Sequence, residues 1–569
     1  MDLNQENLKI LRHSAAHLLA QAVCELFPGT QLTIGPATDD GFFYDCLPVK
    51  NFKEEDLPKI EQRMLALANQ NLPIKHKEIS KIEARKLYKD NPFKLELIDS
   101  IEGDTVGLSV QGDFYDLCRG GHVASTGEIK NFKLSGISGS YWRANRDGQA
   151  LQRLHGTAFF TAKDLTDYQT RQEELQKYDH RVLGKQMDLF SFHDEGPGFP
   201  FFHPKGRAIF NALVQYMRKI QREYHYQEIS TPMLLNEKLW HQSGHYAHYK
   251  DNMYFSCIDN ASFAIKPMNC PGSALVYKTK PRSYRELPLK LAECGSVHRH
   301  ELSGVLHGLF RVRSFTQDDT HMYCMLDQIE DEILTVLNIA KKVLTKFEFN
   351  NIDIALSTRP EKSMGSDLLW EKATAALINA LNKLGINYKI QAGDGAFYGP
   401  KIDIKIKDSM GREWQCGTIQ VDFFLAENFD LSYINSHGTK ERPVVIHHVI
   451  YGSLERFIGI LLEHYKGHLP FLVAPVQARV LTITDEQKNY AQEIAQQLRQ
   501  HGIRIEIDES SDPVSGKIKT AQLDKIPWML IVGNKEAAAL TITLRHGNGK
   551  QESDLTISEL ISKANLLNQ

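Results

Sequence analysis

Two histidines near the N-terminus stand four residues apart, a spacing that places them on one face of a helix. His13 and His17 lie in the helix-prone run Leu8–Val23, on the face opposite its apolar stripe. Far downstream, Cys118 and His122 are also four residues apart. Imidazole and thiolate groups in such a cluster can bind a metal ion or position a water molecule. From spacing alone, two surface histidines and an unrelated buried cysteine explain the pattern equally well.

A second set of charged residues flanks a loop that contains two glycines. Arg299 and Glu301 stand at alternate positions, and Arg311 follows the loop in a predicted strand over Phe310–Phe315. Alternate residues of a strand point to one side, so we expect an antiparallel hairpin here. Its two arginines could clamp a carboxylate and a phosphate together. An ordinary surface hairpin with salt bridges remains the alternative.

A third arginine, Arg456, precedes the apolar helical run Phe457–Leu462. An arginine in the first turns of a mostly buried helix is costly unless a partner neutralises it. A bound phosphate would satisfy it, and so would a carboxylate within the core.

A cysteine and two histidines that are far apart in the sequence form the last candidate set. Cys270, His321 and His447 offer one thiolate and two imidazoles, which suit zinc and would leave its fourth position open. Spacing alone cannot assemble residues this far apart.

The elements that must position these residues belong to more than one domain. A chain of 569 residues is too long for a single hydrophobic core. Helices are predicted over Asn7–Phe27 and Lys59–Asn69, and the charged run Asp164–Leu183 reads as a connecting helix. After Pro475, strand and helix patterns alternate regularly, which predicts a small α/β domain with a largely parallel sheet.

Bulk properties exclude several classes of protein. The net charge of −3 argues against a protein that coats nucleic acid by bulk electrostatics. The polar start, Met1–Arg12, has no signal-peptide core, and no apolar run is long enough to span a membrane. The eight cysteines are scattered without a Cys-x-x-Cys pair, so we expect a reducing, cytoplasmic environment. The common Gly-rich phosphate loops are absent, so ATP, if used, must be held in another way.

Taken together, these stretches resemble the class II aminoacyl-tRNA synthetases and, among them, the threonyl-tRNA synthetase family, over essentially the whole chain. The region of Pro232 resembles motif 1 of that class, Arg299–Phe315 resembles motif 2, and Gly452–Arg456 resembles motif 3. The runs Lys-Pro-Met-Asn-Cys-Pro-Gly from Lys266 and Phe-Thr-Gln-Asp-Asp-x-His from Phe315 make the resemblance specific.

The resemblance implies a multidomain α+β fold with an antiparallel class II catalytic core. The implied parts are an α+β editing domain over residues 1–160, a linker helix over 161–183, the catalytic domain over 184–470 and an α/β anticodon-binding domain over 471–569.

The implied activity is ATP-dependent ligation of L-threonine to tRNA(Thr) through a threonyl-adenylate. Hydrolytic editing of mischarged Ser-tRNA(Thr) accompanies it. The implied cofactors are one Zn²⁺ per chain and Mg²⁺ with ATP, and the implied assembly is a homodimer. A prolyl or seryl enzyme is the nearest alternative, and a catalytically dead tRNA-binding paralogue is another.

The resemblance also assigns roles to single residues. Zinc ligands are Cys270, His321 and His447. The ATP clamp is Arg299, Arg311 and Arg456, and His245 lies near the acceptor ribose. Residues implied to line the threonine and ATP pocket are Met268, Glu301, Phe315, Gln317, Asp319, Tyr398, Lys401, Gln415 and Gln420. Editing residues are His13, His17, Lys94, Asp116, Cys118 and His122, and anticodon contacts are Glu536 and Arg545.

Three features depart from the family pattern. Family members commonly begin with a small ubiquitin-like domain, whereas this sequence starts at the editing domain. Ser273 stands where the family commonly has a histidine, so we expect that role to be lost or taken over. Gly121 stands where the family commonly has proline, and we expect this to loosen the loop because glycine leaves φ free.

Overall fold

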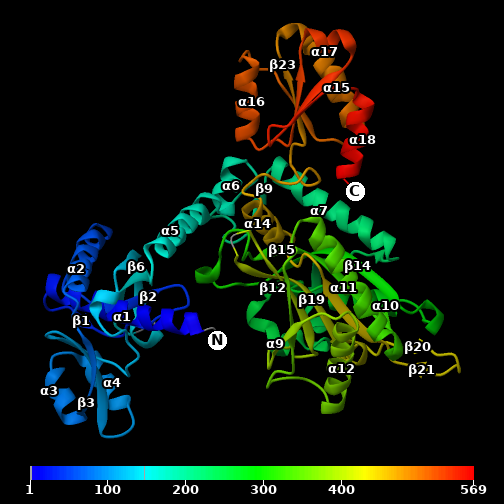
Figure 1. The fold of residues 1–569 in the computed structure, drawn as a ribbon. Helices are drawn as coiled ribbons and strands as arrows, with labels where there is room; N and C mark the ends of the chain where they lie inside the picture. The colour runs from blue at the N-terminus through cyan, green and yellow to red at the C-terminus, as the bar shows by residue number, and fades with distance from the viewer. Residues whose placement is uncertain (1–2, 146–147, 410, 569) are drawn as a thin grey trace. The chain divides into compact units, whose positions relative to one another are not determined.

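The computed structural model describes residues 3–145, 148–409 and 411–568 of the chain. The chain forms two compact units: unit 1 is Met1–Glu174 and unit 2 is Leu175–Gln569 (Figure 1). Among the helices in these ranges, none has the length and apolarity needed to cross a membrane.

Unit 1 is built around a long helix, α1 (Leu3–Leu26), which confirms the helix predicted over 7–27. It packs against α2 (Leu57–Asn69) and a four-stranded antiparallel sheet. In order, the strands of that sheet are β1 (Gln31–Leu32), β2 (Phe42–Leu47), β7 (Ala150–Phe159) and β6 (Asn131–Tyr141). A second, three-stranded sheet carries α3 (Lys81–Leu87) and α4 (Pro92–Ser100); its strands are β3 (Ile74–Ser80), β4 (Thr105–Gln111) and β5 (Phe114–Leu117).

Helix α1 is buried on more than its apolar stripe. Leu11, Ala15 and Leu18 have no exposed surface, as predicted, but His17 on the opposite face is only 3% exposed. That face is covered because the second sheet packs there: Gln111 Nε2 of β4 donates to the carbonyl of His17. The alternative of two surface histidines is therefore wrong for His17.

The predicted connecting helix over 164–183 is two helices. α5 spans Ala162–Lys177 and α6 spans His180–Gln186. Asp179 interrupts them with a non-helical ψ of 132°, and its carboxylate accepts the N–H of Arg181 at 2.7 Å. A carboxylate that caps a new helix in this way ends the previous one, which the charge pattern alone does not reveal.

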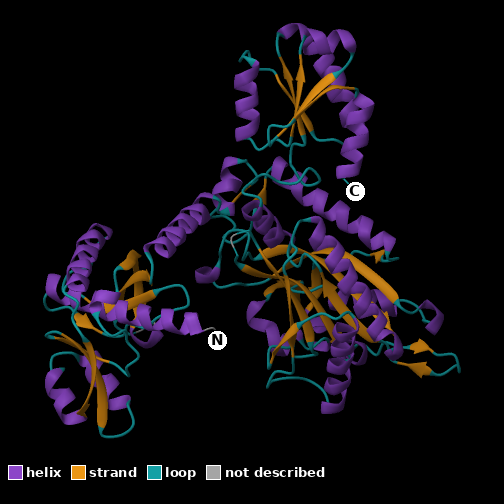
Figure 2. Ribbon diagram, in the orientation of Figure 1, coloured by secondary structure: helices purple, strands orange, loops and turns teal. Residues whose placement is uncertain are grey.

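Unit 2 contains an eight-stranded, mostly antiparallel sheet (Figure 2). Its central strands are β14 (Leu289–His298), β15 (Ser314–Cys324), β22 (Val444–Val449), β19 (Glu413–Asp422) and β18 (Lys401–Lys407). β10 (Gln227–Glu228) extends one edge, and β16 (Ile352–Ser357) with β17 (Tyr388–Gln391) extends the other. Helices α7 (Pro204–Glu223), α11 (Ile329–Lys346), α12 (Asp367–Lys383) and α14 (Leu454–His464) supply the rest of its apolar core.

Smaller elements surround this sheet. They are α8 (Glu237–Gln242), α9 (His245–Tyr249), α10 (Cys270–Lys278), α13 (Phe424–Asn428), and the strands β11 (Leu234–Asn236), β12 (Tyr254–Ile258) and β13 (Ala261–Ile265). Two short hairpins complete the set: β8 (Phe190–Ser191) with β9 (Phe201–Phe202), and β20 (Tyr433–Ile434) with β21 (Lys440–Glu441).

The predicted arginine hairpin exists, but its arginines lie beyond its strands. β14 ends at His298 and β15 begins at Ser314, so Arg299, Glu301 and Arg311 belong to the connecting segment. The strand predicted over 310–315 is therefore wrong at its start. The chain turns here instead of extending, because the N–H groups of Phe310 and Arg311 both donate to the carbonyl of His307.

The C-terminal part of unit 2 has the predicted alternation. β24 (Ile505–Asp508), β23 (Ala478–Thr482) and β25 (Trp528–Val532) pair in parallel, which confirms the largely parallel sheet. Two antiparallel strands extend it at one edge, β26 (Ile542–His546) and β27 (Gln551–Leu555). Its helices are α15 (Lys488–Gln500), α16 (Val514–Leu523), α17 (Asn534–Ala539) and α18 (Ile557–Leu567).

Candidate active sites

A cysteine and two histidines from three elements of unit 2 come together in the structure. His321 of β15 and His447 of β22 are direct partners in the antiparallel register, and Cys270 begins α10. One ligand atom from each of the three lies within 4.8 Å of the others, and all three residues are buried. Sheet register thus assembles what the sequence spacing could not.

The donor set fits a zinc ion. One thiol and two imidazoles are typical zinc ligands, and three protein ligands leave a coordination position open. Burial raises the pKa of the Cys270 thiol and lowers the pKa of His321, which favours the neutral form of both groups. Asp422 Oδ2 lies 3.0 Å from His447 Nε2 and is placed to orient that ring. The sequence patterns did not single out Asp422.

A cavity of about 370 Å³ opens beside this cluster. Its walls include the three donors together with Met268, Arg299, Gln317, Asp319, Tyr398 and Gln420. Polar contacts hold three of these side chains: Tyr398 OH donates to Gln420 Oε1 at 2.5 Å, and Asn269 Nδ2 donates to Asp319 Oδ2 at 3.0 Å.

A second cavity, of about 410 Å³, adjoins the first. The two share Arg299, Gln317, Thr418 and Val449 as lining residues. The second cavity adds Glu301, Phe310, Arg311, Phe315, Gln415, Ser453 and Arg456. The paired cavities therefore offer room for a small molecule at the Cys/His cluster and for an anion among the arginines.

The three arginines of the second cavity are held in different ways. The Arg299 guanidinium lies 5.0 Å from the centre of the Phe315 ring. Arg311 pairs with Glu301 at 2.9 Å and is half exposed. Arg456 Nε donates to the carbonyl of Phe310 at 3.0 Å. Among the described residues, the guanidinium of Arg456 is therefore hydrogen-bonded to backbone carbonyls, those of Phe310 and Gln415, and not to the predicted core carboxylate.

Two predicted pocket residues lie outside the walls of both cavities. Lys401 Nζ lies 2.6 Å from the carboxylate of buried Asp403. His245, at the start of α9, is 3% exposed, with Nε2 at 2.9 Å from Met268 Sδ. Burial lowers the pKa of His245 to about 4, so its imidazole is neutral near pH 7.

Two buried carboxylates that the sequence patterns did not single out fix the start of α14. Asp318 accepts the backbone N–H groups of residues 450, 451 and 452, and Glu455 accepts the N–H of Thr316 at 2.9 Å. Burial raises the pKa of each carboxyl group to about 7. The sequence alone does not distinguish these two carboxylates from the many that lie on protein surfaces.

His13, His17 and Cys118 of the N-terminal Cys/His cluster line a separate cavity in unit 1, of about 520 Å³. Cys118 Sγ lies 3.1 Å from His13 Nε2 and 3.1 Å from His122 Nε2. One ligand atom from each of His13, His17, Cys118 and His122 lies within 4.8 Å of the others, which a metal ion could also use. The helix α1 thus supplies two histidines to a loop that follows β5.

The charges around this cluster are paired. Lys94 Nζ lies 2.5 Å from Asp116 Oδ1, and His17 Nδ1 lies 3.2 Å from Asp116 Oδ2. Burial lowers the pKa of His17, but hydrogen bonds to Asp116 and Cys118 outweigh it and raise the pKa to about 9. Burial likewise raises the pKa of Cys118, yet hydrogen bonds from His122, His13 and His17 lower it to about 3. Tyr44 also donates to Asp116 and was not predicted.

Two of the sequence departures, Gly121 and Ser273, and the predicted anticodon residues have definite positions. Gly121 has a φ of +83°, which proline cannot adopt, so the loop takes a different path from one built with proline. Ser273 Oγ lies 2.9 Å from Tyr323 OH in the core. Glu536 accepts the N–H of Gly533 at 3.0 Å, and Arg545 lies on β26.

Three stretches of the chain match known protein families. Residues 254–465 match the family described as tRNA synthetase class II core domain (G, H, P, S and T). Residues 472–565 match an anticodon binding domain, and residues 108–155 match the threonyl and alanyl tRNA synthetase second additional domain.

Curated relatives cover nearly the whole chain. The threonine--tRNA ligase of Carboxydothermus hydrogenoformans is 53% identical over 95% of this chain and 86% of its own length. That of Clostridium tetani is 50% identical over 99% of this chain and 88% of its own. The chain belongs to the threonyl-tRNA synthetase family. A solved structure titled as the RNA binding domain of threonyl-tRNA synthetase from Cryptosporidium parvum is 40% identical. Its TM-score is 0.66, over 68% of this chain and 98% of its own.

Proposed function

We propose that this chain joins L-threonine to tRNA(Thr) at the expense of ATP and hydrolyses tRNA(Thr) that carries serine. One observation carries the proposal: the buried Cys270, His321 and His447 donors line a cavity that shares Arg299 with the cavity of Arg456. An amino acid held at the donors would place its carboxylate toward the arginines, where a nucleotide phosphate is attracted. Family membership supports the same reading.

In the first step, the threonine carboxylate attacks the α-phosphate of ATP and pyrophosphate leaves. Two anions must be brought together, so fixed positive charge is the main requirement. We assign Arg299 to the carboxylate and α-phosphate, and Arg311 and Arg456 to the far phosphates, with Mg²⁺ accompanying ATP. Glu301, Phe315 and Gln415 would contact the nucleotide. In the second step, neutral His245 would act near the attacking ribose hydroxyl.

The amino-acid end requires a hydroxyl. Valine and threonine have nearly the same shape, and an apolar pocket separates such pairs by only ~10²-fold. A zinc ion held by Cys270, His321 and His447 would supply open coordination to the amine and hydroxyl of threonine. Met268, Gln317, Asp319, Tyr398 and Gln420 would line the remaining walls. Lys401 would act through Asp403 rather than by direct contact, since both Lys401 and Gln415 pair with that carboxylate.

Serine satisfies the same hydroxyl requirement, which explains a second site. The missing methyl group is worth only ~1–3 kcal/mol of discrimination, so some serine would be loaded. We assign hydrolysis of the wrong ester to the cavity of unit 1, with His13, His17, Cys118 and His122 around the ester and Lys94 with Asp116 beneath them. The charged Cys118 and His17 side chains suit the positioning of water.

The remaining assignments concern parts and partners. We propose the editing, linker, catalytic and anticodon-binding parts at residues 1–160, 161–183, 184–470 and 471–569, with Glu536 and Arg545 near the anticodon. Pro232 would lie at the interface of a homodimer, and the cytoplasm is the proposed location.

Threonine-dependent exchange of pyrophosphate into ATP tests the proposal. Each amino acid is supplied in turn to the full-length protein. Threonine should support the fastest exchange, serine a slower one and valine almost none. Exchange that is fastest with proline would favour the prolyl alternative, and no exchange with any amino acid would favour a catalytically dead paralogue.

A further inference from the structure

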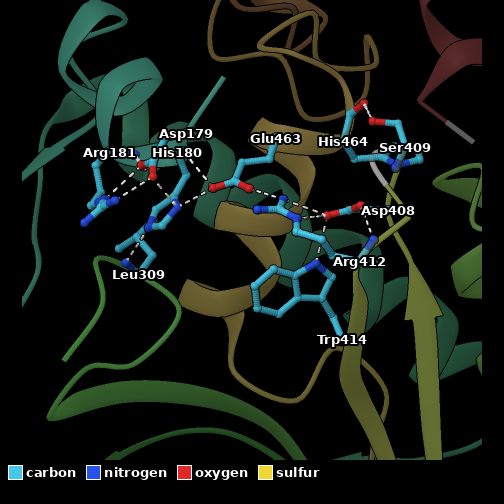
Figure 3. Close-up of polar contacts among 10 residues, drawn as sticks. All are labelled: Asp179, His180, Arg181, Leu309, Asp408, Ser409, Arg412, Trp414, Glu463 and His464. Atoms are coloured by element: carbon cyan, nitrogen blue, oxygen red, sulfur yellow. Dashed lines mark hydrogen bonds and ion pairs between the residues drawn. The ribbon is translucent and has the colours of Figure 1, made fainter. Parts of the chain in front are cut away.

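A buried histidine, His180, contacts two elements of unit 2: the helix α14 and the loop that leads to Arg311 (Figure 3). His180, the first residue of α6, has no exposed surface. Its Nδ1 lies 2.6 Å from Glu463 Oε1 of α14, and its Nε2 lies 3.0 Å from the backbone nitrogen of Leu309. A backbone N–H can only donate, so Nε2 accepts and the ring proton lies on Nδ1, which donates to the carboxylate. One imidazole therefore connects α14 to the loop before Arg311.

Further contacts close this connection into a cycle, which we call the His180 network: His180, Glu463, Arg412, Trp414 and Phe310. Arg412 donates to Glu463 and its guanidinium lies 5.1 Å from the centre of the Trp414 ring. Phe310 packs between the rings of His180 and Trp414, with centroids 4.1 and 4.2 Å away. Asp408 braces the far side by accepting from Arg412 at 2.7 Å and from Trp414 at 2.9 Å.

The His180 network ends at the cavity. The Phe310 carbonyl accepts from Arg456 Nε at 3.0 Å, and the next residue is Arg311. Arg456 and Glu463 lie on the same helix, α14. His180 thus contacts the helix that carries one arginine and the loop that carries the other.

These elements pack so closely that a side chain larger than that of glycine does not fit at two positions. A Cβ atom at Gly308 would lie 2.1 Å from His180 Nε2, and the φ of Gly308 is +49°. A Cβ atom at Gly459 of α14 would lie 2.9 Å from the Phe310 ring. Both contacts require glycine, so the loop backbone and the helix approach their partners as closely as sterics allow.

A histidine that merely fills the core would not need these partners. Glu463 is 1% exposed, and burial of a carboxylate is costly unless its hydrogen bonds are complete. An apolar side chain at position 180 would fill the same space without requiring a buried carboxylate. The cost is understandable if the polar contacts hold the loop in one place.

We propose that His180 is a positioning residue for ATP: through Leu309 and Glu463 it holds the loop and α14 so that Arg311 and Arg456 face one cavity. The inference rests on the proposed function for the identity of the nucleotide. It predicts an effect on ATP and none on threonine, whose proposed site is formed by other residues.

Two substitutions separate the two hydrogen bonds. His180→Asn keeps a donor near Glu463 and loses the acceptor for Leu309, whereas His180→Gln can still accept from Leu309. ATP affinity of the full-length protein is measured by calorimetry. His180→Asn should weaken ATP binding about tenfold, the worth of one hydrogen bond, and His180→Gln should recover most of that loss. Threonine affinity and hydrolysis of Ser-tRNA should stay unchanged in both.

His203→Asn is the matched control. That histidine also contacts a carboxylate through Nδ1, at 2.6 Å from Asp188, and Ser191 through Nε2 at 2.9 Å, but it lines neither cavity. Its substitution should leave ATP affinity unchanged.

A double-mutant cycle decides between positioning and a general structural role. With Arg456→Ala present, His180→Asn should change ATP affinity less than about twofold, because the arginine it positions is gone. Additive losses, an equal loss of threonine affinity, or wild-type ATP affinity in a less stable His180→Asn protein would each overturn the proposal. These binding measurements need no catalysis, so absence of threonine-dependent exchange in the wild type would count against the proposed function and leave the test of His180 intact.

Discussion

In unit 1, Cys118 lies 3.1 Å from two imidazoles, whereas in unit 2 Cys270 is buried beside His321 and His447. The residue types are the same, but their protonation is opposite. Hydrogen bonds lower the pKa of Cys118 to about 3 and raise that of His17 to about 9, which favours a thiolate beside an imidazolium. Burial instead raises the pKa of Cys270 and lowers that of His321.

The neighbours explain the contrast. Asp116 and Lys94 accompany the first cluster and complete its charge pairs. The second cluster is neutral until a cation draws the proton from its thiol. The first cluster is therefore suited to positioning water, and the second is suited to holding a metal.

The largest expected effect is at the neutral cluster. Cys270→Ala should reduce zinc from one ion per chain to background and abolish threonine-dependent exchange, because one of three ligands is lost. Elemental analysis of protein purified without added metal gives the first result. Cys257→Ala, at an exposed cysteine of the same unit, is the control and should change neither. Full threonine activation by metal-free protein would remove the distinction between the two clusters.

The next effect concerns the arginines beside the neutral cluster. Arg456→Ala should slow adenylate formation about 10²–10³-fold, since a fixed charge in a partly dry cleft is removed. Hydrolysis of Ser-tRNA in unit 1 should be unchanged. Arg442→Ala, at a half-exposed arginine that pairs with Glu427, serves as the control. Equal loss of both activities would indicate a folding defect and leave the assignment of Arg456 without support.

The charged cluster makes a prediction about pH. The pKa of His17 is raised from 6.5 to about 9, so its stabilisation is present below pH 6.5 and lost as pH rises through 9. The pKa of Cys118 is lowered from 9.0 to about 3, so its stabilisation is present above pH 9 and lost as pH falls through 3. Between pH 6.5 and 9 the two changes cancel, because folding takes up one proton at His17 and releases one at Cys118.

Cys118→Ala removes one half of this balance. The free energy of unfolding of unit 1 should then fall as pH rises above 6.5, with a slope of up to about 1.4 kcal/mol per pH unit. The fall ends below pH 9, since the lost thiolate helped to raise the pKa of His17. Urea titration with hydrogen exchange of α1 peptides, in the presence of chelator, measures it. Cys24→Ala, on the same helix, should stay level like the wild type; a level Cys118→Ala protein would argue that the pair is uncharged.

The smallest effect lies outside both clusters. Arg545→Ala should raise KM for tRNA(Thr), because one proposed contact to the anticodon is lost. The expected rise corresponds to a loss of about 1 kcal/mol of binding free energy. Adenylate formation should not change. Lys519→Ala, at an exposed position of α16, is the control. An unchanged KM would remove Arg545 from the proposed anticodon surface.

Much of the fold followed from periodicity, and its exceptions have local causes. Helix α1 and the parallel strands near the C-terminus are long, regular patterns, and both appeared as predicted. The break between α5 and α6 depends on a cap made by Asp179, and the displaced start of β15 depends on a turn closed by the His307 carbonyl. Such features follow from single hydrogen bonds or torsions, which residue patterns do not encode.

The sites divide in the same way. The motifs of the family named most of the predicted residues that line the cavities, but not those that hold them in place. Asp422, Asp318 and Tyr44 act on other protein groups, and carboxylates and tyrosines of that kind are too common to stand out in one sequence. The sheet register that joins His321 to His447 also becomes visible only in three dimensions.

The proposed function requires that the Cys270 cluster admits serine and that the Cys118 cluster removes it as Ser-tRNA(Thr). The direct test supplies wild type and a His13→Ala, His17→Ala double variant with ATP, excess serine and tRNA(Thr), and follows Ser-tRNA over time. The account predicts that Ser-tRNA accumulates with the double variant and stays near background with the wild type, while both make Thr-tRNA at similar rates. Equal amounts of Ser-tRNA from the two proteins would contradict the account.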